Sequence, residues 1–428
     1  VPVLLDAWQR RPQRAEPLHE LAVGYRNRSE FHLAYQFAKL GTEIPCPDDL
    51  LFVHHDVYRH GLLFELAIAA YWVGRADEAL ALNDRLLRDG VPDWLEPWVR
   101  TNRQWCLRQL DTGRDAPSVP IPALDALTTL HALVAGAACH DIELDTGGWP
   151  ILNPCIARDE DGFRMIVRSV NYRLDAGRYS MLDGSDTVRT NNYLMRLDRE
   201  GTVLACDSMP PIPPGPPTYP SRVHGVEDCR LVRLGDRWFA SATVRDRNPT
   251  ERCEIALMQL DGASVVDMQV LESPHPTRHE KNWMPFSHDE ALHFLYRCAP
   301  TIVLRCDTET GALTEVVHRE GPVMASEFRG GSQGVTMDDG YVFVVHEVGT
   351  TATGSSRAYA HRMILLDRDL ELVAISPRFC FRAPAIEFCA GLAVRGDEFL
   401  FSVGIDDCTA HLFRAPVASL LALLEPAR

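Results

Sequence analysis

The sequence predicts a mainly β protein, a five-bladed β-propeller preceded by a short α-helical hairpin domain. Three observations lead to this fold class. The chain has 428 residues, more than one ordinary domain of about 100–200 residues. Its apolar periodicity changes from helical to strand-like after the first third. In the second part, a pattern of strand, aspartate, turn and strand recurs four times, which indicates internal repetition.

The first 115 residues have the apolar spacing of helices. Leu18, Leu21, Ala22 and Tyr25 follow one helical face, and similar spacing returns up to Tyr71, 46 residues after Tyr25. Small residues let neighbouring helices approach while an aromatic ring fills the groove. This pattern loosely resembles tetratricopeptide-like repeats, whose usual period is about 34 residues. Residues 1–115 are therefore predicted to be a short tetratricopeptide-like domain of helical hairpins.

Residues 116–140 are predicted to be a linker. The stretch from Asp115 to Pro122 contains three prolines, which remove backbone donors and favour extended conformations. Beyond it, short apolar runs such as 163–170 and 238–244 are divided by Asp, Gly and Pro, as in a domain of many short strands. Residues 141–428 are therefore predicted to be the β domain.

The recurring aspartates predict the number of blades. Asp198, Asp261, Asp307 and Asp367 are separated by 63, 46 and 60 residues, and each interval has room for about four short strands. Four such repeats and a closing strand near Leu412 predict five blades. A β-sandwich with similar hairpins is the alternative fold.

Composition excludes several classes of protein. With 43 basic and 59 acidic side chains the formal net charge is −16, which disfavours binding to nucleic acid. No apolar run approaches the roughly 20 residues of a membrane-spanning helix, and the first residues do not resemble a signal peptide. The 12 cysteines are scattered singly without a CxxC pair, as in a reducing compartment. The sequence therefore predicts a cytoplasmic protein.

Polar side chains interrupt the apolar strands about once per predicted blade. Asn, Asp, Glu and Arg are depleted in strand interiors, and the inner strands of a propeller converge on its axis, where ligands bind. We therefore expect a site there. The candidates are Asn153, Arg168, Asn171, Tyr172, Asn192, Glu227, Asp228, Arg230, Lys281, Asn282, Trp283, Arg329, His346, Glu347, Tyr359, His361, Arg362, Glu387 and Asp407.

Several short motifs among these residues resemble a known family. They are Asn153-Pro154, Arg168, the box from Gly225 to Arg230 with Glu227 and Asp228, Lys281-Asn282, Gly330-Gly331, and Gly404 with Asp407. Together they resemble the five-bladed-propeller carbohydrate-active enzymes, in particular the β-mannoside phosphorylases of glycoside hydrolase family 130 and related glycosyltransferases. Cys229 stands where that family usually has proline.

The resemblance implies that Asp228 is the general acid, or the base in the reverse direction. Glu227 and Asp228 are neighbours on a strand-like segment and point to opposite sides, so Glu227 is expected to pair with an arginine. A phosphate or nucleotide leaving group needs a basic cradle. Its candidates are Arg168, Arg230, Lys281, Arg329 and Arg362, with structural ion pairs as the alternative role.

Sugar hydroxyls need partners that both donate and accept, which suits asparagine amides. Asn153, Asn171 and Asn192 are the candidates, with Asn191 beside them. Trp283 and Tyr172 are candidates for stacking on a pyranose ring.

The sequence thus predicts an inverting glycosyltransferase or glycoside phosphorylase that needs no cofactor or metal. Its expected partners are a sugar phosphate or nucleotide-sugar donor and a glycan or small-molecule acceptor. The helical domain is expected to position the acceptor, bind a protein or mediate self-association.

Three alternatives stay open. Hydrolysis on the same scaffold would need Glu347, Glu387 or Asp407 as the partner of Asp228. A non-catalytic carbohydrate- or protein-binding module is the second alternative. A metal-dependent enzyme is the third, with Glu347 or Glu387 beside His224, His279, His346 and His361.

Overall fold

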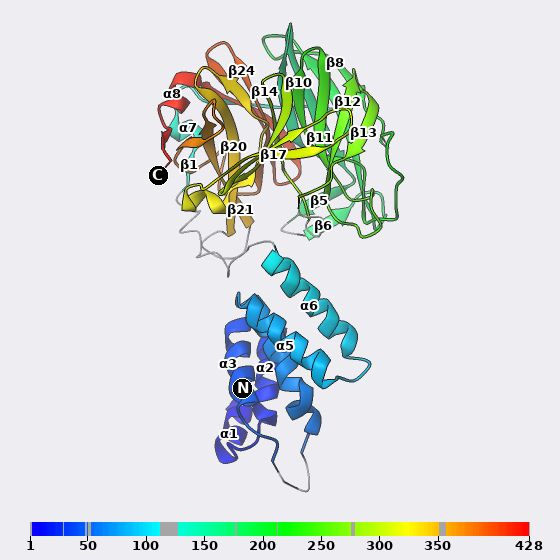
Figure 1. Ribbon diagram of the computed structural model, residues 1–428, viewed down its shortest axis with the longest axis vertical. Helices are drawn as coiled ribbons and strands as arrows, with labels where there is room; N and C mark the ends of the chain where they lie inside the picture. The colour runs from blue at the N-terminus through cyan, green and yellow to red at the C-terminus, as the bar shows by residue number, and fades with distance from the viewer. Residues whose placement is uncertain are drawn as a thin grey trace. The chain divides into compact units, whose positions relative to one another are not determined.

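The computed structural model describes residues 2–28, 30–47, 49, 53–111, 127–175, 178–211, 213–274, 279–350 and 357–427. The chain divides into two compact units, residues 1–120 and residues 121–428 (Figure 1). The first unit is helical and the second is mainly β, as the sequence predicted. Among the described residues, no helix has the length and apolar character needed to cross a membrane.

The helical unit is a series of helices in which each packs on the next. Alanines at the contacts, such as Ala22, Ala34 and Ala70, are fully buried and let the helices approach closely around Tyr35. This arrangement explains the small-residue spacing of the sequence, and the likeness to tetratricopeptide repeats stays a prediction. The elements are α1 (Pro2–Arg10), α2 (Glu16–Asn27), α3 (Phe31–Thr42), the π-helical turn η1 (Val57–Gly61), α4 (Leu62–Trp72), α5 (Ala76–Asp89) and α6 (Glu96–Asp111).

Four sheets of the β unit have the form of a propeller blade, with antiparallel strands joined largely in chain order. The first contains β3 (Ile151–Asp159), β4 (Gly162–Val170), β7 (Val188–Leu197), β8 (Val203–Ser208) and the short β9 (Val223–His224). The second contains β10 (Glu227–Leu234), β11 (Arg237–Val244), β12 (Glu254–Asp261) and β13 (Ser264–Val270). The third contains β14 (Met284–His288), β15 (Ala291–Cys298), β16 (Thr301–Cys306) and β17 (Leu313–Arg319). The fourth joins β24 (Glu387–Arg395), β25 (Glu398–Ile405) and β26 (Thr409–Pro416) to β2 (Ala138–Asp141).

The remaining large sheet has eight strands and a less regular order. The eight strands are β18 (Arg329–Gly330), β19 (Val335–Met337), β20 (Gly340–Thr350), β21 (Arg357–Leu366), β22 (Leu372–Ile375), β23 (Phe379–Cys380), β1 (Thr128–Thr129) and β27 (Glu425–Pro426).

The β5–β6 hairpin (Tyr172–Asp175 and Arg178–Met181) forms a separate two-stranded sheet. The short helical elements of this unit are α7 (Leu130–Leu133), η3 (Val323–Glu327) and α8 (Val417–Leu421).

The predicted count of five blades is not confirmed, because within the described residues four sheets have the regular form. The eight-stranded sheet departs from it where β18 and β19 share the edge of β20 with a gap between them. Gln333 lies in that gap, buried, and its amide nitrogen donates to the carbonyls of Ile156 on β3 (2.6 Å) and Leu392 on β24 (2.8 Å). The chain leaves the strand ladder here so that one side chain ties three sheets together.

Part of the predicted linker is folded, which corrects the boundary at residue 140. β1, α7 and β2 lie between residues 128 and 141, and β2 pairs with β26 near the end of the chain. Residues 112–126, which hold the prolines, lie outside the described residues. Short strands such as β1 and β2 gain their stability from partners far along the chain, so local sequence does not reveal them.

The recurring aspartates are explained by turns. Asp198 accepts hydrogen bonds from the amides of Glu200 and Thr202, and Asp307 accepts them from Glu309 and Thr310. Such side-chain bonds to the following backbone fix tight turns. In these two sheets the aspartate therefore marks the hairpin between the last two strands, β7–β8 and β16–β17.

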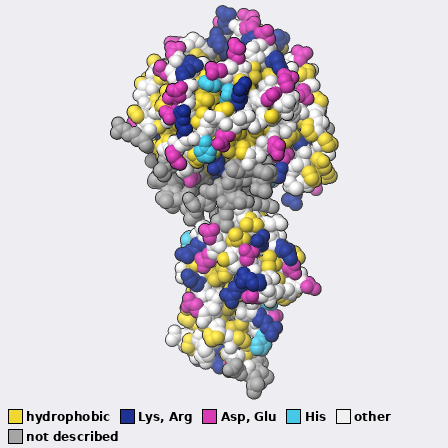
Figure 2. Space-filling view, viewed as in Figure 1, with side chains coloured by type: hydrophobic (Ala, Val, Ile, Leu, Met, Phe, Trp, Pro, Cys, Tyr) yellow, Lys and Arg dark blue, Asp and Glu magenta, His cyan; other side chains and the backbone are white. Residues whose placement is uncertain are grey.

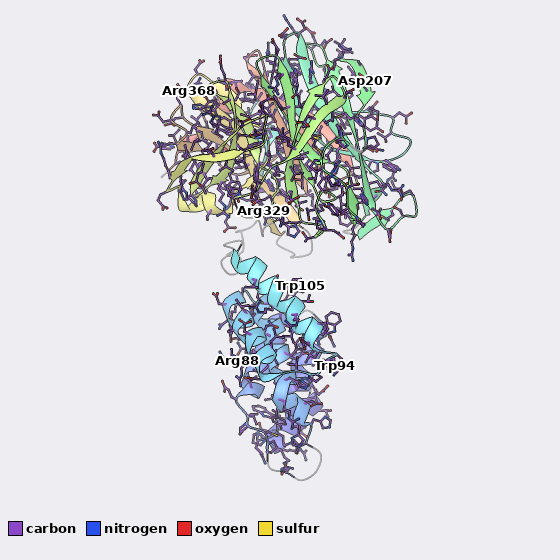
Figure 3. The ribbon with its side chains drawn as sticks, turned by 45° about the vertical axis from the view of Figure 1, so that its right-hand side comes forward. Arg88, Trp94, Trp105, Asp207, Arg329 and Arg368 are labelled. Carbon is purple, nitrogen blue, oxygen red and sulfur yellow. The ribbon has the colours of Figure 1, made fainter. Side chains whose placement is uncertain are left out.

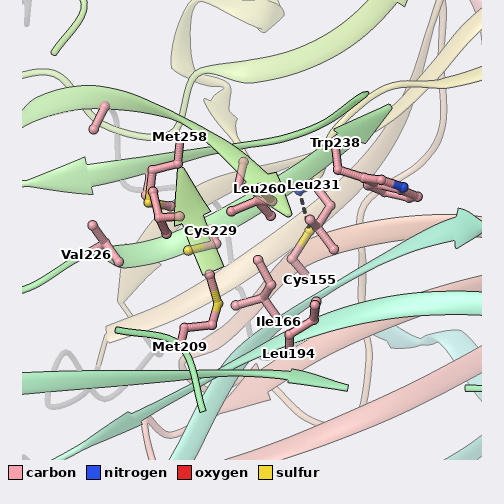
Figure 4. Packing of buried hydrophobic residues seen from close by; sticks show 14 of the residues in the cluster. Cys155, Ile166, Leu194, Met209, Val226, Cys229, Leu231, Trp238, Met258 and Leu260 are labelled. Carbon is pink, nitrogen blue, oxygen red and sulfur yellow. Dashed lines mark hydrogen bonds between the residues drawn. The ribbon is translucent and has the colours of Figure 1, made fainter. Parts of the chain in front are cut away.

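Apolar clusters fill the spaces between neighbouring sheets. Figure 4 shows one of them, where sulfur-containing side chains such as Cys155, Cys229 and Met258 pack together. All 12 cysteines are unpaired thiols and eight are buried, in agreement with the expectation of single thiols. On the surface, acidic and basic side chains are interspersed over the visible face of each unit (Figure 2).

Candidate active site

The candidate site begins at one edge of the sheets, where the inner strands start. Asn153 on β3, Asp228 on β10, Asn282 before β14, and Asp407 after β25 all have positive φ, at 45°, 52°, 60° and 50°. Left-handed conformations of non-glycine residues cost of order 1 kcal/mol each and cluster at functional sites. Four sheets thus each supply one strained polar residue at the same edge.

Arg168 on β4 is the centre of this site. Its guanidinium donates to Glu227 Oε1 at 2.8 Å and to Asp228 Oδ1 at 2.9 Å, and it is 4% exposed. Two neighbouring carboxylates therefore bind one cation, because the bulge between Glu227 and Arg230 turns both side chains toward it. This explains how adjacent strand residues, expected to point to opposite sides, share a partner. Thr190, which the sequence analysis did not single out, lies 3.3 Å from the same guanidinium.

Asp228 is held in its ionised form. Burial alone would raise its pKa, but the charge of Arg168, a 2.8 Å hydrogen bond from the Asn153 amide nitrogen, and the charges of Lys281 and Arg230 outweigh burial. The pKa of Asp228 therefore lies below its ordinary value. The Asp228 side chain keeps 17% of its surface exposed, so a ligand can reach it.

Asp407 has the opposite tendency. Burial raises the pKa of Asp407 above its ordinary value; Arg168 opposes this shift, and the negative charge of Asp228 adds to it. The Tyr179 hydroxyl donates to Asp407 Oδ2 at 3.3 Å. Asp407 is thus the carboxyl of this site that is poised to hold a proton.

Tyr179 lies on the β5–β6 hairpin. In the sequence this hairpin comes between β4 and β7, which pair directly with each other in the first sheet. The pKa of Tyr172 is raised by burial, and its ring packs against Tyr179 edge to face, with centroids 5.0 Å apart. Tyr172 therefore supports the ring of Tyr179 from below the surface. Tyr179 itself is 61% exposed. The sequence analysis did not single out Tyr179.

Arg230 holds together the backbone segments that carry the site residues Asp228 and Asn282. Its guanidinium donates to the carbonyls of Gly331 (2.6 Å) and Asp228 (2.8 Å) and to Asn282 Oδ1 (3.0 Å). Lys281 Nζ lies 3.7 Å from Glu227 Oε2, with its side chain 42% exposed. The structure thus brings together the predicted residues Asn153, Arg168, Glu227, Asp228, Arg230, Lys281, Asn282 and Asp407.

Three predicted sugar contacts have structural roles. Asn171 donates to Asp183 Oδ2 at 2.9 Å and organises the turn after β6. Asn192 donates to the Val226 carbonyl at 3.0 Å and supports the segment before Glu227. Trp283 is buried against Phe294 and Tyr296, with its indole nitrogen 3.0 Å from Glu280 Oε2. It packs in the core and presents no face to a sugar.

The predicted acids Glu347 on β20 and Glu387 on β24 are bound by other groups of the protein. Glu347 accepts from Arg362 Nε at 2.6 Å and lies 2.5 Å from Arg378 Nη2. Glu387 accepts three backbone N–H bonds, from residues 381, 382 and 383; burial nevertheless raises its pKa. Neither acid is positioned as the partner of Asp228, and Arg362 belongs to an ion pair rather than to a phosphate cradle.

His346 and His361 lie between the eight-stranded sheet and the β24–β26 sheet. Burial lowers the pKa of both rings, that of His361 to about 3. Tyr359, predicted to contact substrate, stacks on His346 with centroids 4.9 Å apart. Arg329 on β18 is exposed (Figure 3) and its charge also lowers the pKa of His346. These rings are neutral core residues.

The four histidines of the metal alternative do not converge. His224 lies 3.4 Å from Asp246, and His279 accepts from the Cys253 amide. In the part of the chain that the structure describes, one group has metal-ligand geometry, Cys139, Asp141 and His411. It is at the β2–β26 edge, where Asp141 is already bonded to His411 at 2.8 Å and Arg382 lies 3.8 Å away.

No family model matches the chain, and no curated protein matches its sequence. Among solved structures, it is similar to a β-1,2-mannobiose phosphorylase from Listeria innocua in complex with β-1,2-mannobiose (13% identity, 66% of this chain and 94% of that chain, TM-score 0.46). It is also similar to a mannose phosphorylase from Leishmania mexicana in complex with phosphate (10%, 68% and 92%, 0.43). A putative glycosidase from Bacteroides thetaiotaomicron is a third (14%, 63% and 87%, 0.42). Similarities of this strength do not assign an activity.

Proposed function

We propose that residues 121–428 form an enzyme that cleaves glycosidic bonds, with Asp228 and Asp407 as its acid–base pair. One observation carries the proposal: two carboxyls at one strand edge have pKa values shifted in opposite directions by a shared environment. Such divergence is the pattern of acid and base roles in glycoside cleavage. The motif resemblance noted above points to the same class of substrate.

The roles follow from the protonation states. Asp407, whose pKa is raised, gives its proton to the glycosidic oxygen as the bond from the sugar carbon breaks. Asp228, whose pKa is lowered, takes a proton from the nucleophile as the new bond forms. After the reaction Asp228 carries a proton and Asp407 does not. Proton exchange with water then restores the starting protonation state of each carboxyl. The motif resemblance implied that Asp228 is the general acid, or the base in the reverse direction; its lowered pKa favours the base.

The cations of the site favour water as the nucleophile. Three arginines of the predicted cradle are engaged: Arg168 by two carboxylates, Arg362 by Glu347, and Arg230 by carbonyls and an amide. A phosphate dianion would therefore have to compete with Glu227 and Asp228 for Arg168, and the guanidinium of Arg230 already has acceptors for its N–H groups. Because these arginines are already bound by groups of the protein, we favour hydrolysis over phosphorolysis.

Phosphorolysis is the second candidate, and one observation favours it. The side chains of Lys281 and Arg329 are substantially exposed, so both offer solvent-facing cationic groups that can attract phosphate. In that case the products would be a sugar 1-phosphate and the shortened glycoside, and the reverse reaction would be glycosyl transfer.

We also infer that the eight-stranded sheet serves as a fifth, irregular blade. Its β20–β21–β22 segment has the blade order, and apolar clusters join it to the sheets on both sides. The site would then lie where five inner edges meet.

The test is product analysis on a panel of glycosides that includes β-linked mannosides, with and without phosphate. Hydrolysis predicts free sugar in both conditions, whereas phosphorolysis predicts sugar 1-phosphate only with phosphate. Asp407→Asn and Asp228→Asn should each lower turnover by about 10²–10⁴-fold, and Asp207→Asn, at an exposed position on β8, should not. Cleavage at the wild-type rate by both site variants would contradict the proposal.

A further inference from the structure

The helical unit has a concentration of exposed tryptophans. Four of the chain's eight tryptophans lie on α4 and α6 or just before α6, and they are 40–69% exposed. By contrast, Trp238 and Trp283 of the β unit are buried. Figure 3 marks two of the exposed ones, Trp94 beside the start of α6 and Trp105 further along it. We call Trp94, Trp98, Thr101 and Trp105 the tryptophan stripe.

The stripe has the spacing of a helix-packing seam. Its members follow one another by 4, 3 and 4 residues, as do the core positions of helices that pack side by side. A second face at the start of α6, with Val99 and the preceding Leu95, is already buried against Leu86 of α5 and Leu63 of α4. α6 is therefore apolar on two faces, and a surface helix needs only one.

A hollow lies beside the stripe. It has a volume of about 390 Å³ and is lined by the stripe, by Phe64, Ile68 and Tyr71 of α4, and by Trp72. Within the stripe, Thr101 is a small residue between two indoles. The same surface thus holds projecting rings and places to receive them, as a two-fold symmetric contact between identical chains requires.

Charge does not oppose such a contact. Arg26, the one charged side chain among the residues that line the hollow, is paired with Glu65 at 2.5 Å. At the rim, Arg100 is paired with Glu96 (2.6 Å) and Arg103 with Asp84 (2.5 Å). Two copies would therefore meet through locally neutral surfaces although each chain has a formal charge of −16.

The exposed area is of the size that a dimer needs. At up to about 250 Å² for each ring, the exposed fractions of the four tryptophans give roughly 500 Å² of aromatic surface. This is at the upper end of apolar patches on monomers, and with Phe64, Ile68 and Tyr71 it approaches the roughly 800 Å² that each partner buries in a stable complex. We propose that the chain forms a homodimer in which the tryptophan stripe of one copy packs against that of a second copy. The proposal is independent of the proposed enzyme activity.

Sedimentation of the full chain over a wide concentration range tests the proposal. We expect a monomer–dimer equilibrium for the wild type. The double variant Trp94→Ser/Trp98→Ser should weaken the dimer by about 100-fold or more, because large aromatic side chains dominate interface energies. Trp94→Ser alone should weaken the dimer less, because it removes one ring only. This variant does not alter the helix, since Trp94 precedes α6. Leu204→Ser, at a residue of the β unit that is 65% exposed, is the control and should leave the equilibrium unchanged.

Quenching of tryptophan emission by acrylamide gives the second measurement, and circular dichroism checks that the variants keep their helices. We expect quenching of the wild type to decrease as the dimer forms. A monomer at every concentration would overturn the proposal, as would a dimer that the double variant leaves intact. Indoles shielded in a monomer would also overturn it, because another surface would then cover the stripe.

Discussion

At the scale of single residues, the site depends on a buried cation bound to two carboxylates. Arg168 is almost fully buried with Glu227 and Asp228. Removing one partner of a buried ion pair costs more than the pair contributes, because an uncompensated charge remains. Arg168 therefore controls both the stability of the site and the low pKa of Asp228.

Arg168→Met should destabilise the β unit by about 3–5 kcal/mol at neutral pH. The penalty should shrink as the pH falls, because protonation of Asp228, whose pKa burial raises once the charge of Arg168 is gone, removes an unpaired charge. Thermal unfolding of the wild type and variant at several pH values measures the difference. Arg199→Met, at an exposed pair 3.4 Å from Asp161, is the control and should cost under about 1 kcal/mol. An equal cost for both variants would show that the Arg168 pair has no special role.

The sequence could predict these residues because Asn, Asp, Glu and Arg are depleted in the interiors of strands. It could not separate them from polar residues that only hold the fold together. Trp283 and Glu347 stand in similar polar segments, yet one packs in the core and the other binds two arginines. Which role a side chain has depends on neighbours from distant strands.

At the scale of elements, the β20–β21 pair shows how register divides such roles. His346 pairs directly with His361, and Val345 pairs with Arg362. Because side chains alternate between faces, the two histidines face the β24–β26 sheet, while Arg362 faces the other side with Glu347. A shift by one residue would exchange the faces and bury the ion pair against Phe381 and Phe388, which pack on the two histidines.

His361 should make the β unit sensitive to acid. The unfolded imidazole gains a proton below its ordinary pKa of 6.5, but the folded ring does so only near a pKa of about 3. The contribution of His361 to the free energy of unfolding is therefore fully present above pH 6.5. It is lost as the pH falls toward 3, by about 3 kcal/mol at pH 4. His361→Phe should remove the His361 part of this slope and leave the part that comes from His346, whose pKa is also lowered by burial, as seen in thermal unfolding between pH 7 and pH 4.

His318→Gln provides the control, because His318 is exposed on β17 and should leave the slope unchanged. An acid slope that is as steep in His361→Phe as in the wild type would assign the sensitivity to other groups.

At the scale of the whole molecule, the β unit is closed by strands from its two ends. β2 near its start pairs with β26 near its end, from Ala138 opposite Arg414 to Asp141 opposite His411. Without β2, the edge of β26 would lose its partner and expose unpaired backbone groups. The closing strand is thus short but connects residues about 270 positions apart.

Two truncations test this closure. Removal of residues 1–126 should leave a folded β unit, because its sheets contain strands from residue 128 onward. Removal of residues 1–141 also deletes β1 and β2 and should lower the unfolding temperature and promote aggregation. Calorimetry and light scattering of the two fragments give the comparison. Equal stability of the two fragments would show that β2 does not close the sheet.

The sequence predicted the division into a helical part and a mainly β, propeller-like part, because periodicity is a local property. The count of regular blades and the true start of the β unit depend on pairing between distant strands. Gln333, which joins three sheets, and β2, which joins two ends of the unit, illustrate interactions that local patterns do not reveal.

The central claim is that Asp407 holds the proton and Asp228 the negative charge during glycoside cleavage. The most direct measurement is the pH dependence of kcat/KM for a cleaved glycoside in the wild type, Asp407→Asn and Asp228→Asn. The account predicts a bell-shaped wild-type profile, with an acid limb below the ordinary aspartate range from Asp228 and an alkaline limb above it from Asp407. Each variant should lose the corresponding limb together with most of its turnover. Profiles of wild-type shape and height in both variants would contradict the account.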